Sequence, residues 1–316
     1  MAASKPTYTF LFQKKLEPPT VAAYTEQRKR FKAWCRRHGY TLHKASLCDA
    51  AMSNYIHVLY RLGESIGNAR NALYGLLNVH PELKKRMPRS RAALAGWEKS
   101  KMSKSYPPLS RTVTNAVAFF MSLHGYGSMA VATLLAFHCY LRASELCNLQ
   151  VADVLFPGDA RIPLVKAQAG LLIRKAKTGK FQWVAVEHPD FVEMLRVLVQ
   201  KARKRRRQRL FTFSTTKWRN VLQNVCRLLQ LKPRYVLHSL RHGGAVCDYL
   251  GGRPLKDIKL RGRWVSDKSL KTYLQAGRAL LMDMSLPPPV RLFGLLSASP
   301  LLLLCFAQHC RSGHCQ

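Results

Sequence analysis

Apolar residues recur with the spacing of an amphipathic helix over most of this chain of 316 residues, and this periodicity limits the folds open to it. In the N-terminal third the pattern predicts a row of helices. Thr20, which follows two prolines, is expected to cap the first, and Gly63 lies just beyond the second. The third ends at His80 and the fourth covers residues 90–99. Short polar connections between such helices are typical of a small helical bundle.

The segment KSKMSKSYPPLS, residues 99–110, is basic, rich in serine and interrupted by two prolines, so it predicts a linker between two domains. After it, RIPLVK and the hairpin GLLIRKAKTGKFQWVAV have the composition of short strands, with a turn at Thr178 and Gly179. Helical patterns fill the rest, at residues 109–124, 128–141, 190–208, 217–230, 239–250, 254–261 and 266–281. The sequence therefore predicts a mainly α fold with a small inserted β-sheet, in two domains.

The charge of the chain restricts its partners. It carries 52 Lys plus Arg against 16 Asp plus Glu, a formal net charge of +36, while 47% of its residues are apolar, enough for a sizeable core. A folded protein this basic repels itself and requires an anionic partner. Nucleic acid fits best, because each phosphate contact releases a counterion and adds affinity. A membrane surface and an acidic protein are the alternatives.

Nothing in the pattern predicts a secreted or membrane-spanning protein. The N-terminus lacks the apolar run of a signal peptide, and the most apolar stretch, Leu292 to Phe306, falls short of the roughly 20 residues that a bilayer requires. Nine scattered cysteines indicate thiols in a reducing intracellular compartment. Potential zinc ligands crowd the C-terminus, but their spacing fits no standard zinc site and favours an unstructured tail without metal: Cys305, His309, Cys310, His314 and Cys315.

Several polar residues stand where a plain helical protein has no use for them. Arg142 closes an apolar helical pattern, where an unpaired charge is costly to bury, and Lys177 lies at the tip of the hairpin. His238 and Arg241 are three residues apart, so they share a face of a helix. Each alone has an ordinary structural explanation, as a helix cap, a soluble turn or a hydrogen-bonding core residue.

Trp264 and Tyr273 add an indole donor and a phenol to this set, although either is by itself more often a core aromatic residue. If these residues converge on one site, they suit cleavage of a phosphodiester. They supply cations for the non-bridging oxygens, an acid for the leaving oxygen and a nucleophile in line with the bond that breaks. The chain offers no carboxylate pair of the usual two-metal kind. The chemistry implied therefore uses no metal and no cofactor.

The same residues resemble, in order and in spacing, the tyrosine recombinase (phage integrase) family. The resemblance rests on R-A-S-E-L at Arg142, Lys177, H-S-L-R-H at 238–242, G-R-W at 262–264 and Tyr273. His238 precedes Arg241 by three residues. Trp264 follows 23 residues later and Tyr273 nine after that, as the family's pattern requires. The resemblance covers roughly residues 108–281.

The resemblance implies a two-domain DNA clamp. A helical core-binding domain would comprise residues 1–104, a tyrosine recombinase catalytic domain residues 105–285 and a C-terminal tail residues 286–316. The partner would be double-stranded DNA, held by a homotetramer, with no small-molecule substrate and no membrane. The apolar stretch 290–306 would be exposed in a monomer and buried against a neighbouring protomer.

For the chemistry, the resemblance implies that Tyr273 attacks the scissile phosphate, which leaves a 3′-phosphotyrosine and a free 5′-hydroxyl. Arg142 and Arg241 would hold the non-bridging oxygens through the two parallel donors that a guanidinium offers. Glu145 would orient either the arginine-bearing or the histidine-bearing segment, and His242 would be either a helper of the site or a helix residue near DNA. The energy of the broken bond is kept in the phosphotyrosine, so neither ATP nor metal is needed.

Lys177 would be the general acid for the 5′-oxygen, and a shift of the hairpin register would give that role to Lys175 or Lys180 instead. His238 would assist proton transfer at the tyrosine. Most of the family has histidine where this chain has Trp264. An indole can donate a hydrogen bond but cannot exchange a proton, so this position would serve positioning.

The motifs H-S-L-R-H-G-G and G-R-W resemble recombinases of eukaryotic mobile elements, of the DIRS or Crypton kind, which implies DNA integration and transposition in a nucleus, or otherwise an intracellular location with DNA. The basic run 201–209 would then bind DNA phosphates, act as a nuclear localisation signal, or both. Its DNA-binding candidates are Lys201, Arg203, Lys204, Arg205, Arg206 and Arg207.

Two other functions stay open on the sequence. A type IB topoisomerase uses the same chemistry but rejoins the same strand. A decayed copy of a mobile element would keep the fold and the charge as a DNA-binding protein without turnover.

Overall fold

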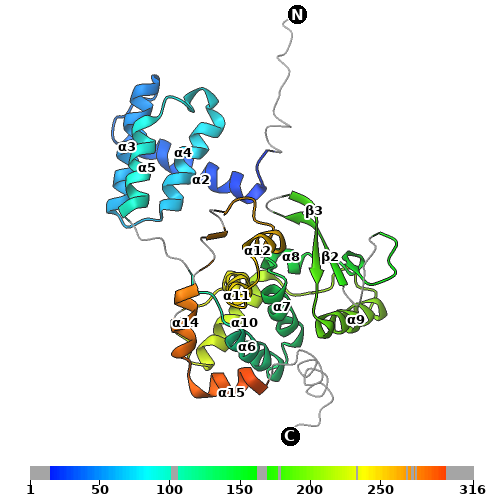
Figure 1. Ribbon diagram of the computed structural model, residues 1–316. Coiled ribbons are helices and arrows are strands. Elements are labelled where there is room, and N and C mark those ends of the chain that lie inside the picture. Colours follow the sequence, from blue (N-terminus) through cyan, green and yellow to red (C-terminus); the bar gives the residue numbers. More distant parts are fainter. Residues whose placement is uncertain are drawn as a thin grey trace, which may run out of the picture. The chain divides into compact units, whose positions relative to one another are not determined.

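A computed structural model describes residues 15–100, 106–161, 169–176, 179–232, 234–267, 270–271, 274 and 276–296. The chain divides into two compact units, Met1–Lys104 (unit 1) and Ser105–Gln316 (unit 2). Over the described residues unit 1 is helical, and unit 2 is helical with one small sheet (Figure 1). Within these ranges no helix combines the length and the apolar character needed to cross a membrane.

Unit 1 contains the helices that the sequence predicts. They are α2 (Pro18–Arg37), α3 (Ala45–Arg61), α4 (Ile66–Val79) and α5 (Pro88–Ser100), with a short 3-10 turn, η1 (Pro81–Leu83), before α5. The prediction that Thr20 caps the first helix is wrong, because α2 begins two residues earlier with Glu17 as its N-cap. Proline has no N–H to lose and a fixed φ that fits the first helical turn, so the two prolines begin the helix instead of preceding it.

The core of unit 1 is built on aromatic rings and close helix packing. Phe31 of α2 lies 5.4 Å from the ring of Tyr55 of α3, and Trp34 lies 5.3 Å from that same ring. A side chain at Gly75 of α4 would put its Cβ 2.7 Å from the carbonyl oxygen of Tyr24, so glycine is what lets α2 and α4 approach.

A buried carboxylate fixes the start of α5. Asp49 of α3 is 3% exposed and accepts hydrogen bonds at 2.9 Å from the backbone amides of Arg89 and Ser90. The Ser90 hydroxyl donates a third, at 2.6 Å. The amides at the N-terminus of a helix lack partners within the helix and carry a partial positive charge, so they stabilise the buried anion.

Unit 2 contains the following elements, in chain order: α6 (Arg111–Leu123), α7 (Gly127–His138), α8 (Ala143–Cys147), η2 (Val151–Asp153), β1 (Val154–Leu155), β2 (Ala169–Ala176), β3 (Gly179–Val186), α9 (Pro189–Lys204), α10 (Thr215–Leu228), α11 (Leu237–Leu250), α12 (Leu255–Gly262), α14 (Ala276–Met284) and α15 (Pro288–Leu296). The core gathers around α6, α7 and α10, where the indole of Trp218 donates to the hydroxyl of Thr133 at 3.1 Å.

Two predicted helices of unit 2 differ in the structure. Arg142 does not end a helix, because α7 stops at His138 and Arg142 is the N-cap of α8. The helix expected over residues 266–281 is interrupted, since Leu274 is not helical and α14 begins at Ala276. Apolar spacing continues through both breaks because the connecting residues are themselves packed in the core.

The small sheet has the order β1-β2-β3, with both pairs antiparallel. Leu171 pairs with Val184 and Ala169 with Val186, and all four side chains are buried in the core that α9 shares. This confirms the predicted hairpin. The predicted strand RIPLVK lies mostly outside the described residues, as do Lys177 and Thr178 at the hairpin tip.

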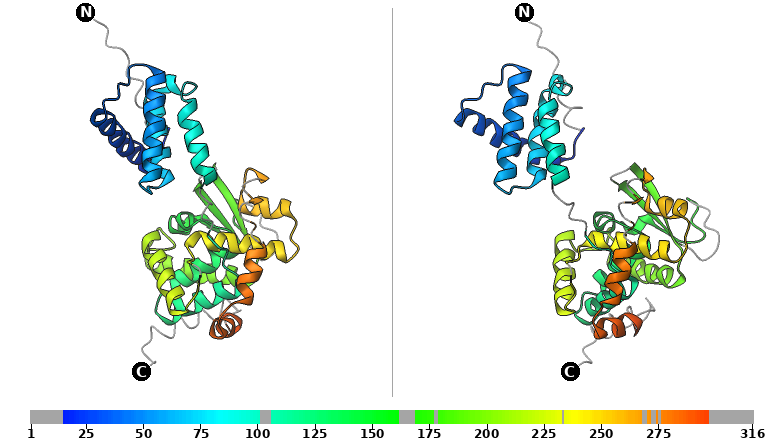
Figure 2. Two further views of the ribbon diagram at one scale, coloured as in Figure 1. Left: turned by 90° about the vertical axis from the view of Figure 1, so that its left-hand side faces the viewer. Right: turned by 60° about the vertical axis from the view of Figure 1, so that its left-hand side comes forward.

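The segment predicted as a tail from residue 286 begins with a helix that packs into unit 2. Val290 of α15 is fully buried, and the ring of Phe293 lies 4.9 Å from that of Phe120 of α6. The ribbon of α15 lies next to that of α14 at one end of unit 2 (Figure 2). A Cβ on Gly294 would lie 2.5 Å from the backbone of Thr112, so the two helices are in close contact. One face of this part of the apolar stretch is therefore covered within the same chain, while Leu292 and Leu295 are exposed. Residues 297–316 lie outside the described residues.

We expect Asp49→Ala to lower the free energy of unfolding by about 3 kcal/mol, because it removes hydrogen bonds to a buried charged acceptor and leaves helix amides unpaired. Urea denaturation of the full chain measures the change. Glu98→Ala is the matched control: its partner Arg70 is half exposed, so the loss should be much smaller. Equal losses for the two variants would contradict this account of Asp49.

Candidate active site

Arg142 and Glu145 form the first part of the site, at the start of α8. Arg142 is the N-cap, and its backbone amide donates to Oε2 of Glu145 at 2.9 Å. Its guanidinium Nη1 donates to the other carboxylate oxygen at 2.7 Å. The side chain of Glu145 is 2% exposed and that of Arg142 19%, so the carboxylate is buried behind an arginine that still reaches solvent.

Arg263 is the second cation on Glu145, and sequence analysis missed it. Its Nη2 donates to Oε2 of Glu145 at 2.8 Å, and its side chain is 7% exposed. Burial favours the neutral acid, but the charge of Arg263 and the hydrogen bonds from Arg142 outweigh burial and lower the pKa of Glu145. Glu145 is therefore an ionised bridge between two arginines that are distant in sequence.

Arg241 of α11 is fully buried. Its Nη1 donates to the backbone carbonyl of Tyr140, and its Nη2 donates to the carbonyl of Gly262. The guanidinium carbon lies 4.6 Å from the centre of the Trp264 ring, in cation–π contact. Arg241 thus joins the segment before Arg142 to the end of α12 and to Trp264.

Glycines allow this close packing. A Cβ on Gly262 would lie 1.7 Å from the ring of Trp264, and one on Gly244 would lie 1.9 Å from the carbonyl oxygen of Phe137. Either substitution would force the indole or the end of α7 to move. The glycines of the G-G and G-R-W motifs are therefore required by the approach of α11, α12 and α7.

Tyr140 links the site to a group of charges beside it. Its φ is +48°, its side chain is fully buried, and its hydroxyl donates to Asp248 at 2.5 Å. Burial and this hydrogen bond raise the pKa of Tyr140. Asp248 also pairs with Arg253 at 3.1 Å, and Glu187 receives Arg253 at 2.8 Å and Arg261 at 2.6 Å. Tyr140 is near Arg142 in sequence, and Asp248, Arg253 and Arg261 are near or within α12, but Glu187 carries no such sequence signal.

The two histidines of H-S-L-R-H have different environments. His238 is exposed, whereas His242, one helical turn later, is 6% exposed, and their rings are 4.8 Å apart. Burial, together with the charges of His238 and Arg241, lowers the pKa of His242 to about 3. His242 is therefore neutral near pH 7, which suits a structural or hydrogen-bonding role better than proton transfer.

Tyr273 and Lys177 both lie outside the described residues. On either side of Tyr273 in sequence, Leu270 is 3% exposed and Leu274 is partly buried, and both pack in a small cluster with Tyr140 and Trp264. The two alternatives for the general acid, Lys175 and Lys180, face each other in register across β2 and β3.

The basic run forms the end of α9 and the turn after it. Lys201, Arg203 and Lys204 lie in the last helical turn, where cations are favoured by the helix dipole. Arg206 has a φ of +50° and reverses the chain. All six predicted DNA-binding side chains are exposed: Lys201, Arg203, Lys204, Arg205, Arg206 and Arg207.

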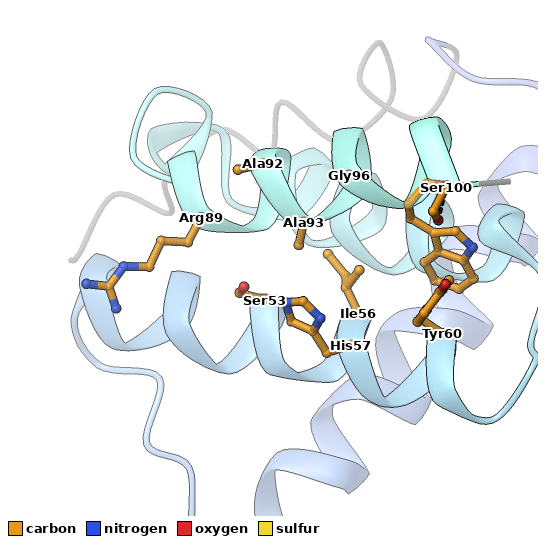
Figure 3. A pocket seen from close by; sticks show the side chains of 10 residues that line it. Ser53, Ile56, His57, Tyr60, Arg89, Ala92, Ala93, Gly96 and Ser100 are labelled. Atoms are coloured by element: carbon orange, nitrogen blue, oxygen red, sulfur yellow. Dashed lines mark hydrogen bonds between the residues drawn. The ribbon is translucent and has the colours of Figure 1, made fainter.

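A pocket in unit 1 contains none of the predicted site residues. It measures about 560 Å³ and lies between α3 and α5, where Ser53, His57 and Tyr60 face Ala93 and Gly96 (Figure 3). In unit 2 a smaller pocket of about 260 Å³ lies beside the charges around Arg253 and Arg261. Neither pocket is lined by Arg142, Arg241 or Arg263.

The structure brings four of the predicted residues together in two contacting pairs, Arg142 with Glu145 and Arg241 with Trp264. Arg263, the neighbour of Trp264 in sequence, joins the pairs through its bond to Glu145. With Arg263 the group holds three guanidiniums and one carboxylate, which leaves a net charge of +2. Such a group can stabilise a phosphoryl group that gains negative charge in a transition state.

Neither a protein-family model nor a curated protein sequence matches this chain. Solved structures match its fold. The Tn1549 transposon integrase in complex with transposon right end DNA is similar with a TM-score of 0.59 at 11% identity, over 88% of this chain and 97% of that one. A lambda integrase fragment, a dimer bound to a COC′ core site, is similar with a TM-score of 0.54 at 16% identity, over 85% and 92%.

The XerH site-specific recombinase bound to palindromic difH substrate is similar with a TM-score of 0.52 at 14% identity, over 75% of this chain and 71% of that one. At these identities the likeness is one of fold. The mainly helical chain with a three-stranded sheet has the fold of the tyrosine recombinases, which confirms the predicted fold class.

The pKa of His242 makes stability depend on pH. The unfolded chain binds a proton at this histidine below about pH 6.5, whereas the folded protein does so only below about pH 3. Stability is therefore lost as the pH falls between these values. We expect His242→Gln to reduce the slope of the unfolding free energy against pH in this range by the equivalent of up to one bound proton. Urea denaturation at successive pH values measures the slope. The exposed His43→Gln serves as control, and an unchanged slope for His242→Gln would contradict the prediction.

Proposed function

We propose that this chain is a site-specific DNA recombinase or integrase that breaks and rejoins strands through a 3′-phosphotyrosine at Tyr273. The observation that carries the proposal is the cluster of Arg142, Arg241 and Trp264 around the Glu145 bridge, in a chain with the tyrosine recombinase fold. Proteins of this fold are described as recombinases and integrases bound to DNA, which supports double-stranded DNA as the substrate.

In the proposed reaction the phenol oxygen of Tyr273 forms a bond to phosphorus while the bond to the 5′-oxygen breaks. The phenol proton is lost to a base, with His238 assisting, and Lys177 gives a proton to the leaving oxygen. A phosphodiester attacked by a phenolate carries two negative charges in the transition state. The net charge of +2 on the arginine cluster stabilises these negative charges.

The two arginines would reach the phosphate differently. Arg142 has an exposed edge and can bind a non-bridging oxygen while Nη1 stays on Glu145. Arg241 is fully buried and donates one N–H of each Nη to a carbonyl, so it would bind the phosphate through its other N–H groups once the residues that cover it move aside. Trp264, stacked on Arg241, would position this guanidinium.

The wider assembly belongs to the same proposal. Unit 1 and unit 2 would act as the core-binding and catalytic halves of a DNA clamp, and four chains would exchange strands in a tetramer. The exposed run at the end of α9 supports phosphate binding and, as a basic segment, entry into a nucleus. An origin in a eukaryotic mobile element is supported by the motifs H-S-L-R-H-G-G and G-R-W.

We expect Tyr273→Phe to abolish covalent protein–DNA adducts and to leave DNA binding unchanged, because it removes only the nucleophilic oxygen. The wild type and the variant are incubated in EDTA with labelled DNA from the chain's own genomic surroundings and separated on an SDS gel. Adducts formed by the variant would show that another residue is the nucleophile.

The same experiment separates the alternatives. Recombinant products indicate a recombinase, and relaxation of supercoiled plasmid without such products indicates a topoisomerase. If neither protein forms an adduct but both bind DNA in a salt-dependent way, the chain is a DNA-binding protein without turnover.

The proposed role of the basic run predicts a change in salt dependence. Replacing Arg205, Arg206 and Arg207 by Gln should reduce the slope of log affinity against log salt by about 0.9 for each phosphate that the variant no longer neutralises. Fluorescence anisotropy with duplex DNA at several salt concentrations measures the slope. An unchanged slope would place these side chains away from DNA.

A further inference from the structure

Arg263 occupies a backbone conformation that arginine does not favour. It follows the last residue of α12 with φ 55° and ψ 41°, in the left-handed region. Glycine is the usual residue at such a helix end, because a Cβ is strained there. A charged side chain held in this conformation next to a candidate site indicates that the side chain itself has a use.

The contacts of that side chain do not suit a role in stability alone. It is 7% exposed and makes one bridge, to Glu145 at 2.8 Å. Among the described residues none accepts a hydrogen bond from its Nε or Nη1, although both atoms are buried. A buried guanidinium with incomplete hydrogen bonding is a costly way to stabilise a fold.

Arg263 is connected to both of the arginines that bind the phosphate in the proposed function. Through its side chain it holds Glu145, whose other oxygen receives Nη1 of Arg142. Its backbone joins Gly262, whose carbonyl receives Arg241, to Trp264, which stacks on Arg241.

We propose that Arg263 is a positioning residue that couples Arg142 to Arg241, so that both guanidiniums are held in register for one phosphate. The inference rests on the proposed function. Arg263 itself need not touch the DNA: its charge fixes the carboxylate of Glu145, and the carboxylate fixes one edge of Arg142. The other edge of that planar guanidinium is then directed outward.

The test uses substitutions that separate the side chain from the backbone. Arg263→Gly removes the bridge and suits the left-handed backbone, and Arg263→Lys keeps the charge without the planar fork. Gln230→Gly is the matched control, because Gln230 also has a positive φ, +53°, and is exposed at the end of α10. Thermal unfolding of the full chain verifies that each variant is folded at the assay temperature.

The readout is the single-turnover rate of adduct formation, measured with the duplex cleaved in the trapping experiment, together with the affinity for that duplex. We expect Arg263→Gly to slow adduct formation by roughly 10- to 100-fold, as misplacement of catalytic groups does, with affinity changed less than about twofold. Arg263→Lys should recover part of the rate, and Gln230→Gly should equal the wild type.

A double-mutant cycle with Glu145→Gln tests the path of the coupling. If Arg263 acts through Glu145, the double variant Arg263→Gly/Glu145→Gln is no slower than Glu145→Gln alone. Effects that multiply would overturn the inference and indicate that Arg263 contacts the phosphate directly. A wild-type rate for Arg263→Gly would overturn it as well. A wild-type protein that forms no adduct would overturn the proposed function, whereas a wild-type protein that forms adducts, beside an equally fast Arg263→Gly variant, would overturn this inference alone.

Discussion

A buried guanidinium holds the candidate site together. Arg241 has no exposed surface, yet it donates to the carbonyls of Tyr140 and of Gly262 at the end of α12, and it stacks on Trp264. Two chain segments that are far apart in sequence, at Tyr140 and at Gly262 to Trp264, thus meet on one side chain. A buried charge without partners costs several kcal/mol. Moving these segments apart would leave the guanidinium of Arg241 without its partners, so that cost opposes their separation. These contacts are the reason why Arg142, Arg241 and Trp264, which are widely spaced along the chain, lie in one site.

The same region carries backbone strain. Tyr140 and Arg263 both have positive φ, at +48° and +55°, and for residues other than glycine this conformation costs of order 1 kcal/mol each. Each is compensated by its side chain, Tyr140 by the hydrogen bond to Asp248 and Arg263 by the bridge to Glu145. Strain next to charge is common where a protein maintains a geometry for chemistry, which is how we interpret it here.

The periodicity of the chain predicts most of its helices and the hairpin, because amphipathic patterns and turn residues act locally. It misplaces the cap at Thr20 and the helix end at Arg142, since proline in a first turn and a break within buried residues leave the apolar spacing unchanged. Arg142, Arg241 and Trp264 were predicted from residue type and spacing. Arg263 and Tyr140 were not, because their importance comes from left-handed backbone and from partners about a hundred residues away. The roles of Tyr273 and Lys177 stay predictions.

The helix α15 also bears on how the chain is made. Its residue Gly294 accepts a hydrogen bond from Asn115 of α6, a contact that spans 179 positions of sequence. During synthesis the apolar face of α6, with Phe119 and Phe120, therefore leaves the ribosome long before the helix that covers it. The core residues of unit 1 all lie within its own short stretch of sequence, so unit 1 can fold before the last helix of unit 2 has been synthesised. Until α15 is synthesised, the apolar face of α6 is a surface that a chaperone can bind.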